Sequence, residues 1–146
     1  MTRSDIFRNQ IESLVEVLNR KGYSVYFNTD DTDRVVFEDR EVFINSRIHP
    51  ENKFYTLLHE LGHIIIGESW PEFQADHPMY VHSPDVYVDG RKERSHAYRV
   101  SLLSEEIEAW KRGRRFAKSI GYIIDDKKYD KYMTENIMTY IDWAAR

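Results

Sequence analysis

Two histidines and a glutamate near the middle of the chain have the spacing of a metal-binding motif. Residues 59–63 read His-Glu-Leu-Gly-His, which is an H-E-x-x-H pattern. In a helix, His59 and His63 project from one face one turn apart, so both imidazoles can reach a single zinc ion. Glu60 follows about 100° around the helix, where its carboxylate can polarise a zinc-bound water. The pattern predicts a catalytic zinc helix with His59 and His63 as metal ligands and Glu60 as the general base.

The residues around the motif predict a helix over residues 54–67. On a helical wheel, the face of the two histidines also carries Tyr55, Thr56, Gly62 and Ile66, whereas most apolar side chains gather on the opposite face. The apolar positions are Phe54, Leu57, Leu58, Leu61, Ile64 and Ile65. The alternative is a buried helix whose histidines only form hydrogen bonds with their neighbours. Two histidines, a glutamate and an apolar back in one helix favour the metal site.

Length and composition limit the classes of protein to consider. With 146 residues, the chain is long enough for one domain with a substantial core. It contains no cysteine, so a metal must be bound by histidine and carboxylate side chains. The net charge of −4 gives no general attraction to nucleic acid. Charged residues near the N-terminus argue against a signal peptide, and the lack of an apolar run of about 18 residues argues against a membrane span, so a cytoplasmic protein is expected.

Periodicity before the motif predicts one helix and three short strands. Ser4 is a suitable N-cap for a helix that runs to Arg20, and Gly22 follows as a stop. The strands are expected at residues 23–28, 34–38 and 41–45. The acidic turn between the first two strands lacks the spacing of an EF-hand loop and is expected to be solvated. A helix, three strands and an H-E-x-x-H helix follow one another in small zincin-type peptidases, so the predicted fold class is α+β.

A catalytic zinc usually has a third protein ligand. The candidates after the motif are Glu68, Glu72, Asp76, His77, His82, Asp85, His96, Glu105, Glu106 and Glu108. A helix expected to begin after Ser104 separates them, because Glu106 falls within its apolar stripe while Glu105 and Glu108 lie about 80° and about 140° from the centre. A carboxylate on a buried face needs a partner, and a metal ion is a suitable one. Glu105 fits better as an acidic residue that favours the start of the helix.

The same residues resemble the signature of the ImmA/IrrE metallopeptidase family. Asn45 ends a predicted strand, Phe54-x-Thr56-Leu57 leads into the H-E-x-x-H motif, and residues 106–109 read Glu-Ile-Glu-Ala, like the E-x-E-A motif of that family. The resemblance implies a minimal zincin-like domain with zinc as cofactor and Glu106 as the third ligand. It also implies a bacterial or phage-related regulatory protease that cleaves a helix-turn-helix repressor.

The sequence departs from the family pattern at one position, and it excludes one related family. Trp110 stands where the family usually has Asn or Asp, so the polar side chain that supports the metal site one turn after the ligand is replaced. The longer metzincin pattern does not fit, because Ile66 and Ser69 occupy its Gly and third His positions.

The whole chain, residues 1–146, is predicted as one metallopeptidase-like domain with two features after the metal helix. Residues 68–103 form a long connection expected to border the cleft, with a hairpin near residues 86–90. Within it, His96 and Tyr98 are candidate catalytic donors for the oxyanion, although ordinary packing or surface roles remain the alternative. Residues 127–145 are amphipathic and are expected to form a helix that docks on the body.

The predicted function is zinc-dependent hydrolysis of a peptide bond. His59, His63 and Glu106 are expected to hold Zn²⁺, and Glu60 is expected to take a proton from the attacking water. The strand at residues 41–45 is expected to be an edge strand on which an extended substrate can pair. The expected partner is a protein substrate, with no direct nucleic-acid contact and no membrane.

Two other classes of function remain open. In the first, the protein is a binding module with a structural zinc, although such a site has no need of Glu60. In the second, it is a nucleic-acid-binding regulator that uses a basic helix face, although a solvated face is the favoured interpretation. The residues of that face are Lys111, Arg112, Arg114, Arg115 and Lys118.

Overall fold

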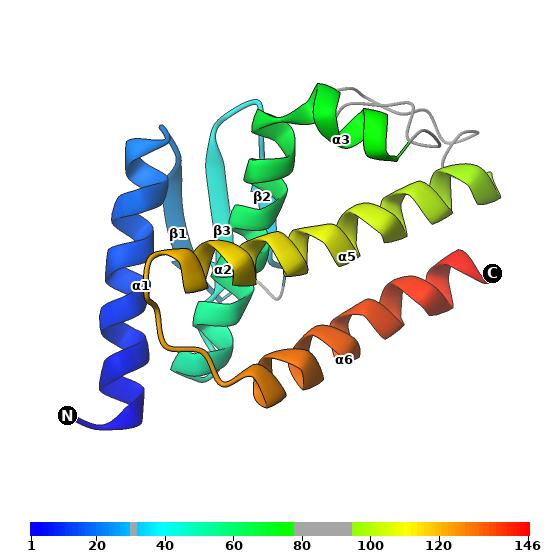
Figure 1. Ribbon diagram of the computed structural model, residues 1–146. Helices are drawn as coiled ribbons and strands as arrows, with labels where there is room; N and C mark the ends of the chain where they lie inside the picture. The colour runs from blue at the N-terminus through cyan, green and yellow to red at the C-terminus, as the bar shows by residue number, and fades with distance from the viewer. Residues whose placement is uncertain (30–31, 78–94) are drawn as a thin grey trace.

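The helix that carries the H-E-x-x-H motif lies buried at the centre of the molecule, and a small sheet packs against one side of it (Figure 1). The computed structural model describes residues 1–29, 32–77 and 95–146. In chain order, the elements are α1 (Arg3–Arg20), β1 (Ser24–Asn28), β2 (Arg34–Val36), β3 (Glu41–Asn45), α2 (Pro50–Glu68), α3 (Trp70–Asp76), α5 (His96–Ser119) and α6 (Asp126–Ala144). Helix α2 contacts α1, the sheet and α5, while α6 runs beside α5. The predicted α+β class is confirmed.

The sheet has the strand order β1-β3-β2. Strand β3 pairs in parallel with β1 and antiparallel with β2, so that Val42 lies opposite both Val25 and Val35. The prediction that residues 41–45 form an edge strand is therefore wrong. The physical reason is burial, because Val42 and Ile44 are 0% exposed and a strand with such a core face is best placed in the middle of the sheet. The edges of the sheet are β1 and β2.

Helix α1 begins earlier than its predicted Ser4 cap. Thr2 Oγ1 accepts a hydrogen bond from the Asp5 backbone N–H at 3.1 Å, and the Asp5 carboxylate accepts one from the Thr2 N–H at 3.1 Å. This reciprocal capping box satisfies two backbone donors at the start of the helix. Phe7, Leu14 and Leu18 are then buried on the face that packs against the core.

Helix α2 is buried along most of its length, and two glycines allow α5 to cross it at close range. A methyl group at Gly62 would overlap the backbone of Ala109, and one at Gly113 would overlap the backbone of Leu58. Without a Cβ at these two positions, the backbones of α2 and α5 can approach each other directly. This crossing brings the start of the Glu-Ile-Glu-Ala segment of α5 onto the H-E-x-x-H face of α2.

Helix α5 begins well before the predicted Ser104 cap. Ser95 is the N-cap, and its Oγ accepts a hydrogen bond from the Tyr98 N–H at 3.1 Å. Ser104 lies inside the helix, where its Oγ donates to the Val100 carbonyl at 3.0 Å. No Pro or Gly interrupts residues 96–103, so the helix can extend back to the Ser95 cap. The connection predicted over residues 68–103 is thus helical at both ends, while the hairpin predicted near residues 86–90 and the candidate ligands His82 and Asp85 lie outside the described residues.

Helix α6 matches the predicted C-terminal helix within a residue at each end. Its acidic residues form ion pairs with residues of the basic face of α5. Arg114 pairs with Asp130 at 2.6 Å and with Asp126 at 3.4 Å, and Lys118 pairs with Asp126 at 2.8 Å. Part of the basic face therefore holds α6 in place, which weakens the case for a nucleic-acid surface. Across residues 1–29, 32–77 and 95–146, no helix combines the length and apolar character needed to cross a bilayer.

Candidate metal centre

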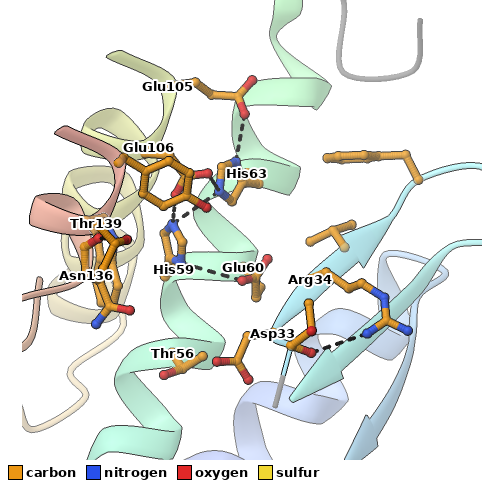
Figure 2. A pocket seen from close by; sticks show the side chains of 15 residues that line it. Asp33, Arg34, Thr56, His59, Glu60, His63, Glu105, Glu106, Asn136 and Thr139 are labelled. Carbon is orange, nitrogen blue, oxygen red and sulfur yellow. Dashed lines mark hydrogen bonds and ion pairs between the residues drawn. The ribbon is translucent and has the colours of Figure 1, made fainter. Parts of the chain in front are cut away.

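A pocket of about 460 Å³ opens between the H-E-x-x-H helix, edge strand β2 and the two C-terminal helices. Helix α2 supplies its floor with Thr56, His59, Glu60 and His63, as Figure 2 shows. One wall comes from β2 and the residues on either side of it, and the opposite wall comes from α5 and α6. The lining residues from these walls are Thr32, Asp33, Arg34, Val35, Phe37, Glu105, Glu106, Trp110, Asn136, Thr139 and Tyr140.

His59, His63 and Glu106 meet at one point in this pocket. His59 Nε2 lies 2.8 Å from one carboxylate oxygen of Glu106, and His63 Nε2 lies 3.2 Å from the other. The two imidazole Nε2 atoms are 3.1 Å apart. All three side chains are buried, and their ligand atoms lie within 4.8 Å of one another. This buried group could hold a metal ion.

The chemistry of these donors suits a divalent cation. Two imidazole nitrogens and one carboxylate form a three-ligand set that leaves room for a further ligand. Burial lowers the pKa of His59 and so favours the neutral imidazole, which is the form that binds metals. For His63 the effect of burial is outweighed by the Glu106 and Glu105 carboxylates, which raise its pKa, so a metal ion would take the place of a proton there. Burial alone would raise the pKa of Glu106, but the neighbouring charges and hydrogen bonds of His63 and His59 hold it well below its usual range. The carboxylate is therefore available in its charged form.

Glu60 lies beside the ligand group without belonging to it. Its Oε1 is 3.5 Å from His59 Nδ1, on the side of the pocket that faces β2 (Figure 2). Burial raises the pKa of Glu60 to about 8, and the negative charges of Glu106, Asp33 and Glu105 add to this effect against the opposing charge of His63. A cation in the pocket would offset the repulsion between these carboxylates.

Two side chains hold the histidine rings from behind. Glu105 Oε2 lies 2.9 Å from His63 Nδ1, and both groups are buried. When Nδ1 donates its proton to Glu105, the lone pair of Nε2 points to the metal position. The Trp110 ring stacks on the ring of His59 with a centroid distance of 4.3 Å and an interplanar angle of 6°. From the sequence, Glu105 was expected only to favour the start of a helix, but in the structure its carboxylate positions the His63 ring. Trp110 stands where a polar residue was expected, and it supports the site by stacking on His59.

The contact between Glu105 and His63 predicts the effect of a conservative substitution. Glu105→Gln keeps the size of the side chain but removes the charge that orients and polarises His63, so zinc affinity should fall about 10- to 100-fold. Competition with a chromophoric chelator measures this affinity. Glu108→Gln is the matched control, because Glu108 lies on the same helix and pairs with Arg112 at 3.2 Å instead. Equal zinc affinities in the two variants would contradict the role assigned to Glu105.

The acidic turn before β2 is part of the pocket wall. Asp33 Oδ1 accepts a hydrogen bond from the Asn45 N–H at 2.7 Å, and burial raises the pKa of its carboxyl group. The prediction of a solvated turn is therefore wrong for Asp33, because this side chain ties the start of β2 to the end of β3. Residues 30–31 of the same turn lie outside the described part of the chain.

The structure places the two predicted oxyanion donors away from the pocket. His96 is exposed at the start of α5, and neither His96 nor Tyr98 lines the pocket. Because α5 is continuous from His96, Tyr98 is eight residues before Glu106, a separation of about 12 Å along a helix axis. The prediction assumed an irregular connection that could fold over the metal, and the extended α5 removes that freedom.

One pocket residue on α6, Tyr140, was not predicted from the sequence. Tyr140 lines the pocket and forms a hydrogen bond with Glu106, and burial together with the charges of Glu106 and Glu60 raises its pKa. The sequence predicts only that residues 127–145 form an amphipathic helix that docks on the body, with no part in the site. The available signal was the spacing of Asn136, Thr139 and Tyr140, which places three polar groups on one helix face at i, i+3 and i+4.

Comparison with known proteins assigns no family or function to this chain. Neither the protein-family models, nor the curated proteins, nor the solved structures give a match to this chain. The metal centre is therefore interpreted from its own residues.

Proposed function

We propose that the protein is a zinc-dependent endopeptidase that acts in the cytoplasm on a protein substrate. The observation that carries this proposal is the position of Glu60, a buried carboxylate next to the ligand group that is not itself a ligand. A purely structural metal site gains nothing from such a neighbour, whereas a hydrolytic site needs a base at this place. The resemblance to the ImmA/IrrE family supports the same class of reaction.

Zinc is the metal that best fits the donors, because two imidazoles and one carboxylate without thiolates are typical of catalytic zinc sites. When bound by His59, His63 and Glu106, zinc would supply Lewis acidity, which lowers the pKa of water and polarises a peptide carbonyl. The pocket volume leaves space for water and a peptide group beside the ligands.

Glu60 would transfer the proton from the attacking water to the leaving nitrogen. Glu60 accepts a proton from the attacking water while the water oxygen bonds to the carbonyl carbon. The same carboxyl then gives this proton to the amide nitrogen as the C–N bond breaks, and the products are a carboxylic acid and an amine, which ionise to carboxylate and ammonium. Without a metal ion the pKa of Glu60 is about 8, and the positive charge of bound zinc would lower it, so that the carboxylate is available near neutral pH to accept a proton and pass it on.

The neighbouring edge strand offers a place for an extended substrate. Strand β2 is an edge of the sheet, and Arg34 and Val35 line the pocket. An extended peptide that added to this edge would lie across the metal position, with backbone hydrogen bonds providing affinity. The substrate class implied by the family resemblance is a helix-turn-helix repressor, and we carry this over as part of the proposal.

Hydrolysis of an unfolded test protein examines the proposal directly. Zinc-loaded protein should cleave denatured casein, 1,10-phenanthroline should stop the cleavage, and added zinc should restore it. Cleavage that persists after complete metal removal, or no cleavage of casein and of candidate repressors by zinc-loaded protein, would contradict the proposed function.

A further inference from the structure

We propose that Tyr140 is a catalytic residue that donates a hydrogen bond to the carbonyl oxygen of the substrate as negative charge develops on it. This inference rests on the proposed peptidase function and assigns the oxyanion donor of the same site. Hydrolysis of an amide requires such a donor, or an equivalent positive charge, because the carbonyl oxygen becomes an oxyanion during attack.

The position of Tyr140 meets the first requirement, which is access to the reaction space. Tyr140 lines the pocket from α6, and its hydroxyl already donates to the carboxylate of Glu106. One oxygen of that carboxylate lies 2.8 Å from His59 Nε2, and the other lies 3.2 Å from His63 Nε2. The Tyr140 hydroxyl is therefore one hydrogen bond away from the metal position.

The second requirement is that the donor lies on the opposite side of the pocket from the base. In Figure 2, Glu60 lies between His59 and Asp33, toward the sheet, whereas Asn136 and Thr139 of α6 lie on the other side of His59. Tyr140 follows Thr139 directly on that same helix. When water activated by Glu60 attacks from the sheet side, the carbonyl oxygen would lie on the α6 side of the pocket.

Other α6 donors in the pocket are committed elsewhere. Asn136 Nδ2 donates to the Tyr132 carbonyl at 2.8 Å, and Thr139 Oγ1 donates to the Asn136 carbonyl at 2.7 Å. Across the pocket, the Arg34 guanidinium lies over the Phe43 ring at 4.3 Å. Of the described α6 residues that line the pocket, Tyr140 is the one whose hydroxyl points at the ligand group.

The electron and proton movements balance without a further reactant. As the water oxygen bonds to the carbonyl carbon, the π electron pair of the C=O bond moves to oxygen, and Tyr140 turns its O–H from Glu106 to this stronger acceptor. Tyr140 keeps its proton throughout, as expected of a phenol at neutral pH. When the electron pair returns, the C–N bond breaks, Glu60 protonates the nitrogen, and Tyr140 returns to Glu106.

The test compares Tyr140→Phe with wild-type protein and with Tyr122→Phe. The control is matched because Tyr122 has its hydroxyl 2.8 Å from Ser13 Oγ on the outside of the fold. Three quantities are measured for each zinc-loaded protein: kcat and KM for a casein-derived peptide, zinc affinity by chelator competition, and the affinity of a phosphinic dipeptide that mimics the tetrahedral oxyanion.

Tyr140→Phe should lower kcat about 100- to 1,000-fold, as loss of one oxyanion donor does elsewhere. KM and zinc affinity should stay close to those of Tyr122→Phe, and the phosphinic dipeptide should bind at least about tenfold more weakly. A parallel loss of zinc affinity and kcat would overturn the inference, because Tyr140 would then only support Glu106.

Failure of this inference is distinguishable from failure of the proposed function. Hydrolysis by wild-type protein with equal kcat in Tyr140→Phe and Tyr122→Phe would overturn the role of Tyr140 and leave the peptidase proposal standing. If wild-type protein cleaves nothing, the phosphinic dipeptide still decides the contact: weaker binding to Tyr140→Phe supports the donor, and equal binding to both variants overturns it.

Discussion

Replacing Glu60 by Gln should stop peptide hydrolysis while the metal group stays intact. Glutamine has the size of glutamate and can occupy the same buried position, but it cannot accept the proton of the attacking water. The expected loss in kcat is about 1,000-fold or more, at the upper part of the range for a general base. Zinc should remain bound, because the ligand atoms of His59, His63 and Glu106 are unchanged.

The control for this prediction is Glu68→Gln. Glu68 lies at the end of the same helix and pairs with Lys21 at 2.8 Å near the surface, so its substitution should leave kcat unchanged. Steady-state kinetics with a casein-derived peptide and chelator competition provide the two measurements. Activity of Glu60→Gln within a few fold of the control would show that another group acts as the base.

Glu60 also predicts a pH dependence of the metal-free protein. Its folded-state pKa of about 8 lies above the ordinary glutamate value of 4.5, so the folded chain holds a proton there that the unfolded chain releases. Stability should therefore fall as the pH rises from about 4.5 to about 8, and this component should be missing from Glu60→Gln. Urea unfolding at several pH values in the presence of a chelator measures the difference.

Gly62→Ala should destabilise the fold by roughly 3 kcal/mol, which is the larger end of the range for overpacking a core. The added methyl group would overlap the backbone carbonyl of Ala109, and a backbone cannot move aside as a flexible side chain can. Helix α5 would be forced away from α2, and Glu106 would leave the two histidines. Zinc affinity should therefore fall together with the free energy of unfolding.

The same substitution five residues later gives a matched control. A methyl group at Gly67 would lie 3.5 Å from a carbon of the Phe37 ring, which is ordinary van der Waals contact. Gly67→Ala should be neutral or stabilise α2 by up to about 1 kcal/mol, because alanine is the better helix former. Thermal unfolding and chelator titration of both variants test the prediction, and equal stabilities would mean that the crossing of α2 and α5 is looser than described.

The metal helix and its partner helix could be predicted because their signals are local. His59 and His63 need only a helix to share a face, and Glu106 was separated from Glu105 and Glu108 by its place in an apolar stripe. Strand boundaries also came close, since alternation and turn residues act over a few positions. These local patterns do not indicate which other helix or strand packs against each face.

The features that sequence reasoning missed depend on contacts between distant segments. The central place of β3 follows from the crossing of the chain between β1 and β2, which strand periodicity does not encode. Glu105 and Tyr140 gain their roles only when α5 and α6 pack against α2, because their partners lie 42 and 34 residues away. Ser104 resembled a cap by residue type, but Ser95 supplies the cap, because the segment between them continues the helix.

The central claim is that His59, His63 and Glu106 bind one metal ion together. The most direct measurement is elemental analysis of chelator-free protein after incubation with zinc and dialysis, for wild type, Glu106→Ala and Glu108→Ala. We expect one zinc per chain in wild type and Glu108→Ala, and loss of zinc in Glu106→Ala. Full zinc retention by Glu106→Ala would contradict the three-ligand site, and no zinc in wild type would contradict the metal centre itself.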